Sequence, residues 1–237
     1  MAGNVIRKRG RIVLSVPAYR APERLPNETD LMTIRYHDQD IAAADLARYT
    51  DSVAIDTETM GLNPHRDRLC VVQLSPGDGS ADVIKIAKGQ TRAPNLEALL
   101  TNPAITKIFH FARFDIGVLY HTFGITVAPV YCTKVASKLT RTYTDRHGLK
   151  DLTRDLIGVD LSKQQQSSDW GADTLTEAQM AYAASDVLYL HELRAKLNVV
   201  LEREERSDLA AACFAFLPTK ARLDLLGWDE TDILDHS

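Results

Sequence analysis

The chain of 237 residues has no long hydrophobic run, no paired cysteines and no excess of positive charge. A membrane-spanning helix needs ~20 consecutive apolar residues, and no run approaches that length, so no membrane partner is expected. Cys70, Cys132 and Cys213 are widely spaced and form no C-x-x-C pair, which favours a reduced cytoplasmic protein with buried thiols. The net charge of −4 excludes a generally basic surface. Any nucleic acid must therefore be held by local basic clusters, which favours a short ligand over a long duplex.

What is present is the composition of a globular protein, with 45% hydrophobic and 25% charged residues. The length suits one substantial domain, which we place at residues 31–237. Residues 1–30 are rich in Pro and Arg, and we expect a poorly ordered extension; a basic arm that touches RNA is the alternative. The apolar patch at residues 12–16 is short for a signal peptide.

The chain is organised around residues 53–62, which read V-A-I-D-T-E-T-M-G-L. Val53, Ala54 and Ile55 are typical of a buried strand, along which side chains alternate between faces. Asp56 and Glu58 then share one face. Two close carboxylates repel each other unless one is protonated or a cation lies between them, and oxygen ligands suit magnesium or manganese. The alternative is a strand end that opens into a solvated turn.

The remaining pattern predicts an α/β fold. Three neighbouring strands with short connections indicate an antiparallel meander, and the strands and helices that alternate after it indicate a mixed central sheet flanked by helices on both faces. The expected strands are 33–36, 53–59, 69–74, 82–86 and 107–111. The expected helices are 38–49, 96–100, 111–123, two between 135 and 155, and one long helix over 174–206.

Two further acids interrupt apolar helix stripes. In the helix over 111–123, Asp115 lies in an inward stripe with Phe111 and Phe114. In the helix over 174–206, Asp186 lies in such a stripe, with Tyr182 one turn before it. A carboxylate on an apolar face is costly unless a partner cancels its charge, although the helix start alone could favour Asp115. Four acids directed at the interior indicate a metal site.

Two loops and the C-terminal region complete the pattern. Residues 141–148 and 163–170 are dense in amide, hydroxyl and basic groups, which suit phosphate oxygens and base edges; a solvated loop is the alternative. Residues 214–228 form a long apolar segment, expected as a C-terminal helical tail, that is suited to burial against a partner.

Three motifs carry a family resemblance: D-T-E at 56–58, H-F-A-R-F-D at 110–115 and Y-A-A-S-D at 182–186. They resemble the four-acid-plus-tyrosine branch of the proofreading-type 3′-5′ exonucleases, whose fold is ribonuclease-H-like. Residues 33–200 are similar to ribonuclease D without the helical domain that usually follows. Longer stretches, such as S-K-Q-Q-Q-S-S-D-W at 162–170, resemble the bacterial nanoRNase C family, and that likeness covers nearly everything after residue 30.

The resemblance implies a 3′-5′ exoribonuclease that cleaves short RNA, mainly dinucleotides, to 5′-mononucleotides with two divalent ions (Mg²⁺ or Mn²⁺). It also implies a ring-like homo-octamer. A ribonuclease-D-like enzyme that trims structured RNA or DNA, and a catalytically silent RNA-binding scaffold, are the alternatives. The implied metal ligands are Asp56, Glu58, Asp115 and Asp186, with Tyr182 orienting or deprotonating the attacking water. The implied substrate contacts are Leu62, His110, Arg113, Lys163, Gln166 and Ser168, with Leu62 as a wedge between two bases.

Overall fold

The computed structural model describes residues 6–8, 11–13, 33–162 and 164–236. It divides into two units, residues 1–31 and residues 32–237. In the first unit, β1 (Ile6–Lys8) and β2 (Arg11–Val13) pair antiparallel. Most of the predicted extension over residues 1–30 lies outside the described residues, so its expected disorder stays a prediction.

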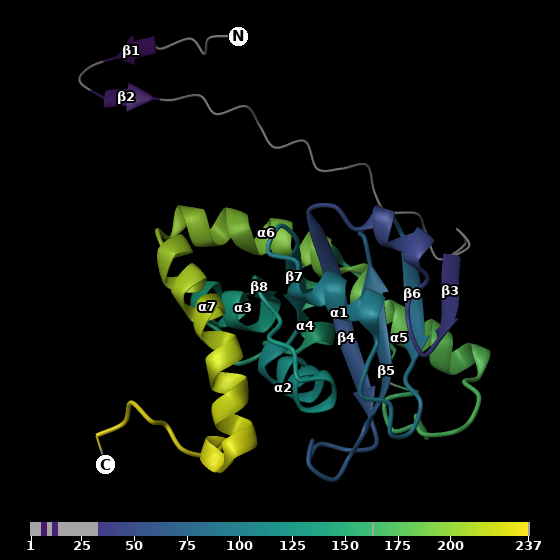
Figure 1. Ribbon diagram of the computed structural model, residues 1–237. Coiled ribbons are helices and arrows are strands. Elements are labelled where there is room, and N and C mark those ends of the chain that lie inside the picture. Colours follow the sequence, from purple (N-terminus) through teal and green to yellow (C-terminus); the bar gives the residue numbers. More distant parts are fainter. Residues whose placement is uncertain (1–5, 9–10, 14–32, 163, 237) are drawn as a thin grey trace. The chain divides into compact units, whose positions relative to one another are not determined.

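The second unit is built on a six-stranded sheet with the strand order β3-β6-β5-β4-β7-β8 (Figure 1). Its strands are β3 (Thr33–Asp38), β4 (Ser52–Thr59), β5 (Leu69–Ser75), β6 (Ser80–Lys85), β7 (Thr106–Phe109) and β8 (Val130–Cys132). β4, β5 and β6 form the antiparallel meander, whereas the β3–β6, β4–β7 and β7–β8 pairs are parallel. The mixed sheet is thus confirmed. The three-residue β8 was not predicted because it is too short to show alternation.

Helices cover both faces of this sheet. They are η1 (Ala43–Arg48), α1 (Pro94–Thr101), α2 (Ala112–Phe123), α3 (Thr133–Thr140), α4 (Leu149–Ile157), α5 (Glu177–Leu188), α6 (Leu190–Arg203), α7 (Ser207–Leu223) and η2 (Asp224–Trp228). α5 packs against β3 to β6, and α2 packs against β5, β7 and β8. All seven residues of β5 are buried, as expected of a strand covered on both faces.

Two helix predictions were wrong. In place of a helix over 38–49 there is one short 3₁₀ segment, η1. Gln39 has a positive φ of 68°, and the carboxylate of Asp40 accepts hydrogen bonds from the amides of Asn95 and Leu96. This acid therefore caps α1 instead of starting its own helix.

The predicted helix over 174–206 is two helices, α5 and α6, that meet at Tyr189. α5 packs on the strands, whereas α6 packs on β7 and on the helices α3, α4 and α7. A single straight helix could not pack one apolar stripe against both the sheet and these helices, so the chain changes direction at Tyr189. α5 begins at Glu177, three residues after the predicted start, because Thr176 and Gln179 form a capping box there.

The apolar residues expected as a C-terminal helical tail lie in α7 and η2. α7 covers Ser207–Leu223 and buries Phe214 and Leu217, with α2, α3 and β8 among its neighbours. Leu226 and Trp228 in η2 stay exposed, at 68% and 44%. Within the described parts of the chain, no helix has the length and apolar character needed to cross a lipid bilayer.

Candidate active site

Three carboxylates lie close together where α5 packs against β4. Asp56 and Glu58 share one face of β4, and Asp186 on α5 points toward that face. One carboxylate oxygen from each lies within 4.8 Å of the others, and all three side chains are half-buried. The predicted alternation along the strand and the predicted spacing along the helix therefore bring these acids together.

Asp115 approaches the same strand from the opposite side. It lies in the first turn of α2 and is 3% exposed. Its Oδ1 accepts a hydrogen bond of 2.6 Å from Oγ1 of Thr57. Because Thr57 points away from Asp56 and Glu58, α2 and α5 lie on opposite faces of the sheet. The charge of Asp115 nevertheless raises the pKa of both Asp56 and Glu58.

The four acids cannot all be charged without a cation. Burial is the main cause that raises the pKa of Glu58 to about 9 and of Asp115 and Asp186 to about 7. The pKa of Asp56 is also raised well above its usual value, first by burial and then by Asp115, Asp186 and Glu58. Such a set of close oxygen ligands fits a divalent cation of the magnesium or manganese type.

The metal-free protein should lose stability as the pH rises. A carboxyl group whose pKa is higher in the folded than in the unfolded chain keeps a proton on folding, so its stabilising contribution disappears as the pH passes its folded pKa. Between pH 6 and pH 8.5 the melting temperature without metal should fall by several degrees. Saturating Mg²⁺ should reverse this trend because cation binding replaces the protons. Differential scanning fluorimetry at one protein concentration checks both; a flat metal-free profile would contradict the assignment.

Tyr182 completes the group. It lies one turn before Asp186 on α5, and its hydroxyl donates a hydrogen bond to that carboxylate. Burial, followed by the charges of Asp186 and Glu58, raises the pKa of this phenol. Its ring lies 6.0 Å from the ring of Trp170, which is buried. Tyr182 therefore keeps its proton and presents a hydrogen-bond donor beside the acids.

Leu62 lies beside a cavity. It is 83% exposed and follows β4 in the loop over residues 60–68. A cavity of about 490 Å³ lies between this loop, the start of α2 and the C-terminal segment, and its lining includes Leu62, Phe111, Phe114 and Leu225. Apolar and aromatic walls of this kind suit the faces of nucleobases.

Two of the predicted phosphate contacts have partners inside the protein. His110 Nδ1 is hydrogen-bonded to Thr133 Oγ1 at 2.9 Å, and burial, with the charge of Lys134, lowers the pKa of His110 to about 3. The imidazole is therefore neutral. Arg113 Nε donates to Asp224 Oδ2 at 2.7 Å, so a phosphate would have to compete with this carboxylate.

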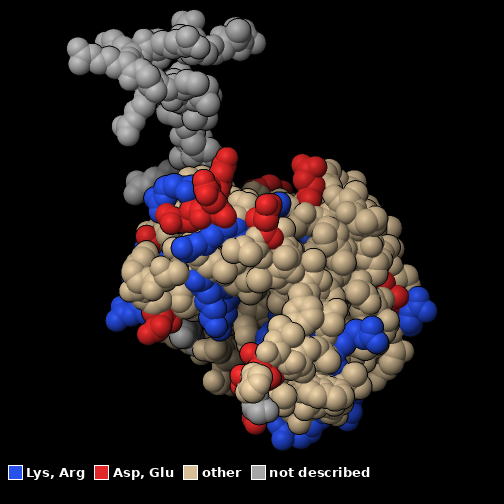
Figure 2. Space-filling model, turned by 90° about the vertical axis from the view of Figure 1, so that its left-hand side faces the viewer, with Lys and Arg blue, Asp and Glu red and all other residues tan. Residues whose placement is uncertain are grey.

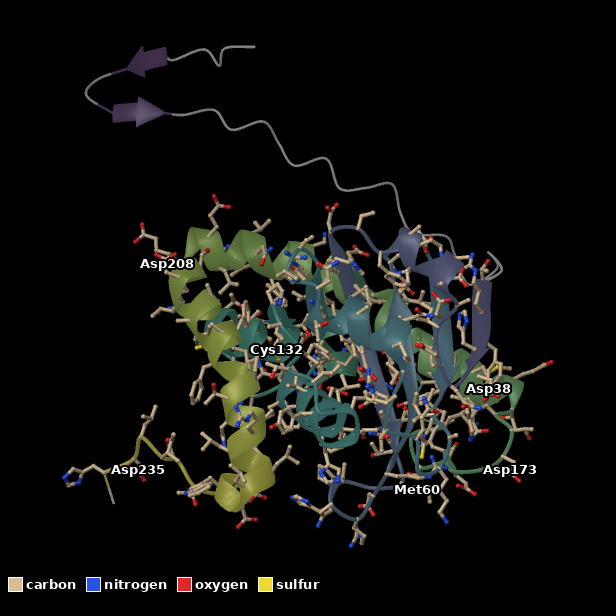
Figure 3. The ribbon with its side chains drawn as sticks, in the orientation of Figure 1. Asp38, Met60, Cys132, Asp173, Asp208 and Asp235 are labelled. Carbon is tan, nitrogen blue, oxygen red and sulfur yellow. The ribbon has the colours of Figure 1, made fainter. Side chains whose placement is uncertain are left out.

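Gln166 and Ser168 lie in the segment between α4 and α5, whereas Lys163 lies outside the described residues. Gln166 is exposed, and Ser168 Oγ donates to Gln165 Oε1 at 2.7 Å. Arg68 donates a hydrogen bond of 3.2 Å to the Gly171 carbonyl, which connects the segment between α4 and α5 to the loop after β4. Figure 3 shows one residue of each, Met60 and Asp173, at the same end of the molecule. Contact of these residues with substrate stays a prediction.

The pattern along the sequence missed two features near the acids. Phe111 was expected in an inward helix stripe, but it precedes α2 with φ of 65° and is 43% exposed. A bulky residue with positive φ is uncommon. Lys134 Nζ lies 4.2 Å from the centre of the Phe111 ring. Thr57 was treated only as the residue between two acids, although its position opposite them is what brings it to Asp115.

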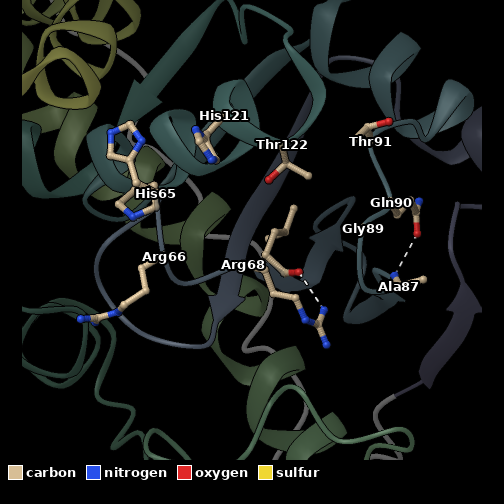
Figure 4. A pocket seen from close by; sticks show the side chains of 11 residues that line it. His65, Arg66, Arg68, Ala87, Gly89, Gln90, Thr91, His121 and Thr122 are labelled. Atoms are coloured by element: carbon tan, nitrogen blue, oxygen red, sulfur yellow. Dashed lines mark hydrogen bonds between the residues drawn. The ribbon is translucent and has the colours of Figure 1, made fainter.

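Two other polar clusters are accounted for by internal partners. Asp82 is fully buried and bonds to Arg48, Tyr49 and His37, which makes it the centre of an ion-pair network. A second cavity of about 230 Å³ is lined by basic side chains (Figure 4). There Arg68 donates to backbone carbonyls, and Arg66 pairs with Asp67.

The sheet order, the three gathered acids, the nearby Asp115 and a tyrosine define the class of ribonuclease-H-like nucleases that depend on divalent metals. Residues 34–202 match a family model described as 3′-5′ exonuclease. The chain belongs to this family.

Known proteins agree with that assignment. Ribonuclease D of Acidiphilium cryptum is 39% identical over 71% of this chain and 43% of its own length; the chain thus spans about two fifths of this curated relative. Brucella melitensis NrnC was solved with bound Mg²⁺ (62% identity, TM-score 0.83, 87% of this chain and 100% of that chain). It was also solved bound to pGG, with 62% identity and a TM-score of 0.84 over the same shares. These likenesses confirm the predicted resemblance to the ribonuclease D and nanoRNase C families.

Proposed function

We propose that this protein is a metal-dependent 3′-5′ exoribonuclease that hydrolyses short RNA, mainly dinucleotides, to 5′-mononucleotides. The observation that carries the proposal is the meeting of Asp56, Glu58 and Asp186 within 4.8 Å, with Asp115 and Tyr182 beside them. The bound pGG in Brucella melitensis NrnC supports a short substrate.

Asp56, Glu58, Asp115 and Asp186 would hold two divalent ions, Mg²⁺ or Mn²⁺. Asp56 would contact both ions, Glu58 and Asp186 would hold the ion on the side of the attacking water, and Asp115 would complete the side of the leaving oxygen. When bound, such ions lower the pKa of the attacking water and neutralise charge on the scissile phosphate.

Tyr182 would orient the attacking water. Because its phenol is protonated and already donates to Asp186, its oxygen can accept a hydrogen bond from the water while the carboxylate fixes the ring. This positions the water relative to the phosphate without a charged base. Thr57 would in turn hold Asp115 in place through its hydrogen bond of 2.6 Å.

Substrate bases would lie on either side of Leu62, with one of them in the cavity next to Phe111. The exposed leucine gives an apolar surface that any base can stack against, which is consistent with little sequence preference. The phosphate and sugar would be contacted by Lys163, Gln166 and Ser168, and by a nitrogen of the neutral His110 ring. Arg113 would contact the phosphate if the phosphate took the place of Asp224 as its ion-pair partner.

We further propose a cytoplasmic homo-oligomer, an octamer by resemblance. Figure 2 shows that the side of the molecule that carries α7 has a broad area without charged side chains. Leu209 and Phe216, seven residues apart and therefore on one face of α7, are 60% and 41% exposed. Large exposed apolar surfaces mark protein interfaces. The three cysteines are free, which suits a reducing compartment. Light scattering measures the mass of the assembly.

Cleavage of 5′-labelled RNAs of two to seven nucleotides tests the proposed substrate. We expect kcat/KM for the dinucleotide to exceed that for the seven-nucleotide RNA by at least about tenfold, which corresponds to a difference of about 1.4 kcal/mol in activation free energy. Equal rates at every length would favour the ribonuclease-D-like trimming enzyme. No cleavage of any RNA with Mg²⁺ or Mn²⁺ would favour a binding protein without activity.

A further inference from the structure

Gln73 is a buried amide that the proposed chemistry does not yet use. It lies in the middle of β5, is 0% exposed, and neither its Nε2 nor its Oε1 has a hydrogen-bond partner among the residues that the structure describes. A buried amide without a hydrogen-bond partner destabilises the folded state. A fold that keeps one in its central strand needs a physical reason for doing so.

The strand register places Gln73 next to the acids. Gln73 is the direct partner of Asp56 in the antiparallel β4–β5 pair, so the two side chains share one face, with Cβ atoms ~5 Å apart. On the other side its direct partner is Val83, which offers no polar atom. Of its two direct strand partners, Asp56 is therefore the one with which Gln73 can form a hydrogen bond.

Apart from Glu58, which lies opposite Val71 and not opposite Gln73, the nearby polar side chains on this face are already engaged. Ser75 Oγ donates to the Ser80 carbonyl at 2.7 Å. Lys85 Nζ donates to the carbonyl oxygens of Trp170 and Ala172. Asp186 accepts from Tyr182. These pairings leave Asp56 as the acceptor that lies in register with the Gln73 amide.

We propose that Gln73 is a positioning residue for Asp56: in the metal-loaded enzyme its Nε2 donates to the Asp56 carboxylate and fixes the orientation of that ligand. This inference rests on the proposed function. A carboxylate that contacts two cations must hold both oxygens in a fixed direction, and a hydrogen bond from a second residue supplies that constraint. A neutral amide supplies it without the positive charge that would repel the cations.

The variant Gln73→Met tests the assignment. Methionine has a similar length and removes the unpaired amide, so the metal-free melting temperature should be unchanged or higher. The affinity for Mn²⁺, measured by isothermal titration calorimetry, should fall about 10- to 100-fold, and kcat should fall with it. A purely structural amide would leave the Mn²⁺ affinity unchanged, and this result would overturn the proposal.

Gln179→Met is the matched control. Gln179 is also a buried glutamine, but its amide accepts from the Thr176 amide and donates to the Asp169 carbonyl. This variant should lose stability and keep its Mn²⁺ affinity.

If Gln73→Met does not fold, Gln73→Asn, whose amide is one methylene too short, should show the same loss of Mn²⁺ affinity. Unchanged affinity in Gln73→Asn would overturn the proposal. Wild-type protein that binds no Mn²⁺ would instead refute the proposed function.

Discussion

Asp186→Asn should reduce kcat by about 10³-fold or more while the protein stays folded. The amide has the same shape as the carboxylate, but it cannot supply the negative charge that holds a divalent cation, and losing about 4 kcal/mol of transition-state stabilisation corresponds to that factor. Removal of one charge from a repelling cluster should leave the metal-free melting temperature at pH 8 equal or higher. Single-turnover cleavage of a dinucleotide and thermal melting with and without Mn²⁺ measure these effects.

Glu177→Gln provides the control for this variant. Glu177 begins the same helix, α5, but is exposed to solvent, so its neutralisation should leave both turnover and the Mn²⁺-induced stabilisation near wild-type values. Turnover of Asp186→Asn within tenfold of the wild type would mean that this carboxylate is not needed for the chemistry. The metal site would then have to be placed elsewhere.

Tyr182→Phe should reduce kcat by about 10²-fold and weaken cation binding by a smaller factor. The phenol hydroxyl lies beside the acids but is not a ligand in our assignment, and a group that positions a reacting water is worth about 10²- to 10⁴-fold. KM for the dinucleotide should change by less than about threefold. Because the ligand Asp186 loses one hydrogen bond, the Mn²⁺ affinity should fall, but less than kcat does. Steady-state kinetics and titration calorimetry separate these quantities.

Tyr36→Phe is the comparison for the tyrosine. Its side chain is 47% exposed and lies on the edge strand β3, so the loss of its hydroxyl should have no effect on kcat. A drop in Mn²⁺ affinity of Tyr182→Phe equal to its drop in kcat would make the phenol part of the ligand set. An unchanged kcat would remove it from the mechanism.

Local periodicity was enough to predict the acids. Asp56 and Glu58 share a face because strand side chains alternate, and Tyr182 lies over the same side as Asp186 because helix positions four residues apart are neighbours. Both rules act within one element. The convergence of the elements followed from the family resemblance, and the structure places Asp56, Glu58 and Asp186 together with Asp115 nearby.

Partners distant in the sequence could not be predicted in this way. Arg113 pairs with Asp224, 111 residues further along the chain, a partner that the sequence pattern did not indicate. Residues 38–49 were expected to form one helix, yet Asp40 caps α1 instead. Phe111 was expected to point inward, yet its positive φ leaves it exposed. In each case a tertiary contact or a backbone conformation, neither visible in hydrophobic periodicity, determined where the side chain lies.

The C-terminal segment supports the part of the protein that would receive the bases. His65, in the loop that carries Leu62, bonds through Nε2 to the Leu225 carbonyl at 2.9 Å, and Arg113, two residues before Asp115, pairs with Asp224. Truncations and affinity tags at the carboxyl end would therefore disturb the base-receiving loop although every acidic ligand stays intact. α7 leads directly into this segment. A protein that binds the outer face of α7 would therefore also affect the position of the loop that carries Leu62, which couples assembly to base binding.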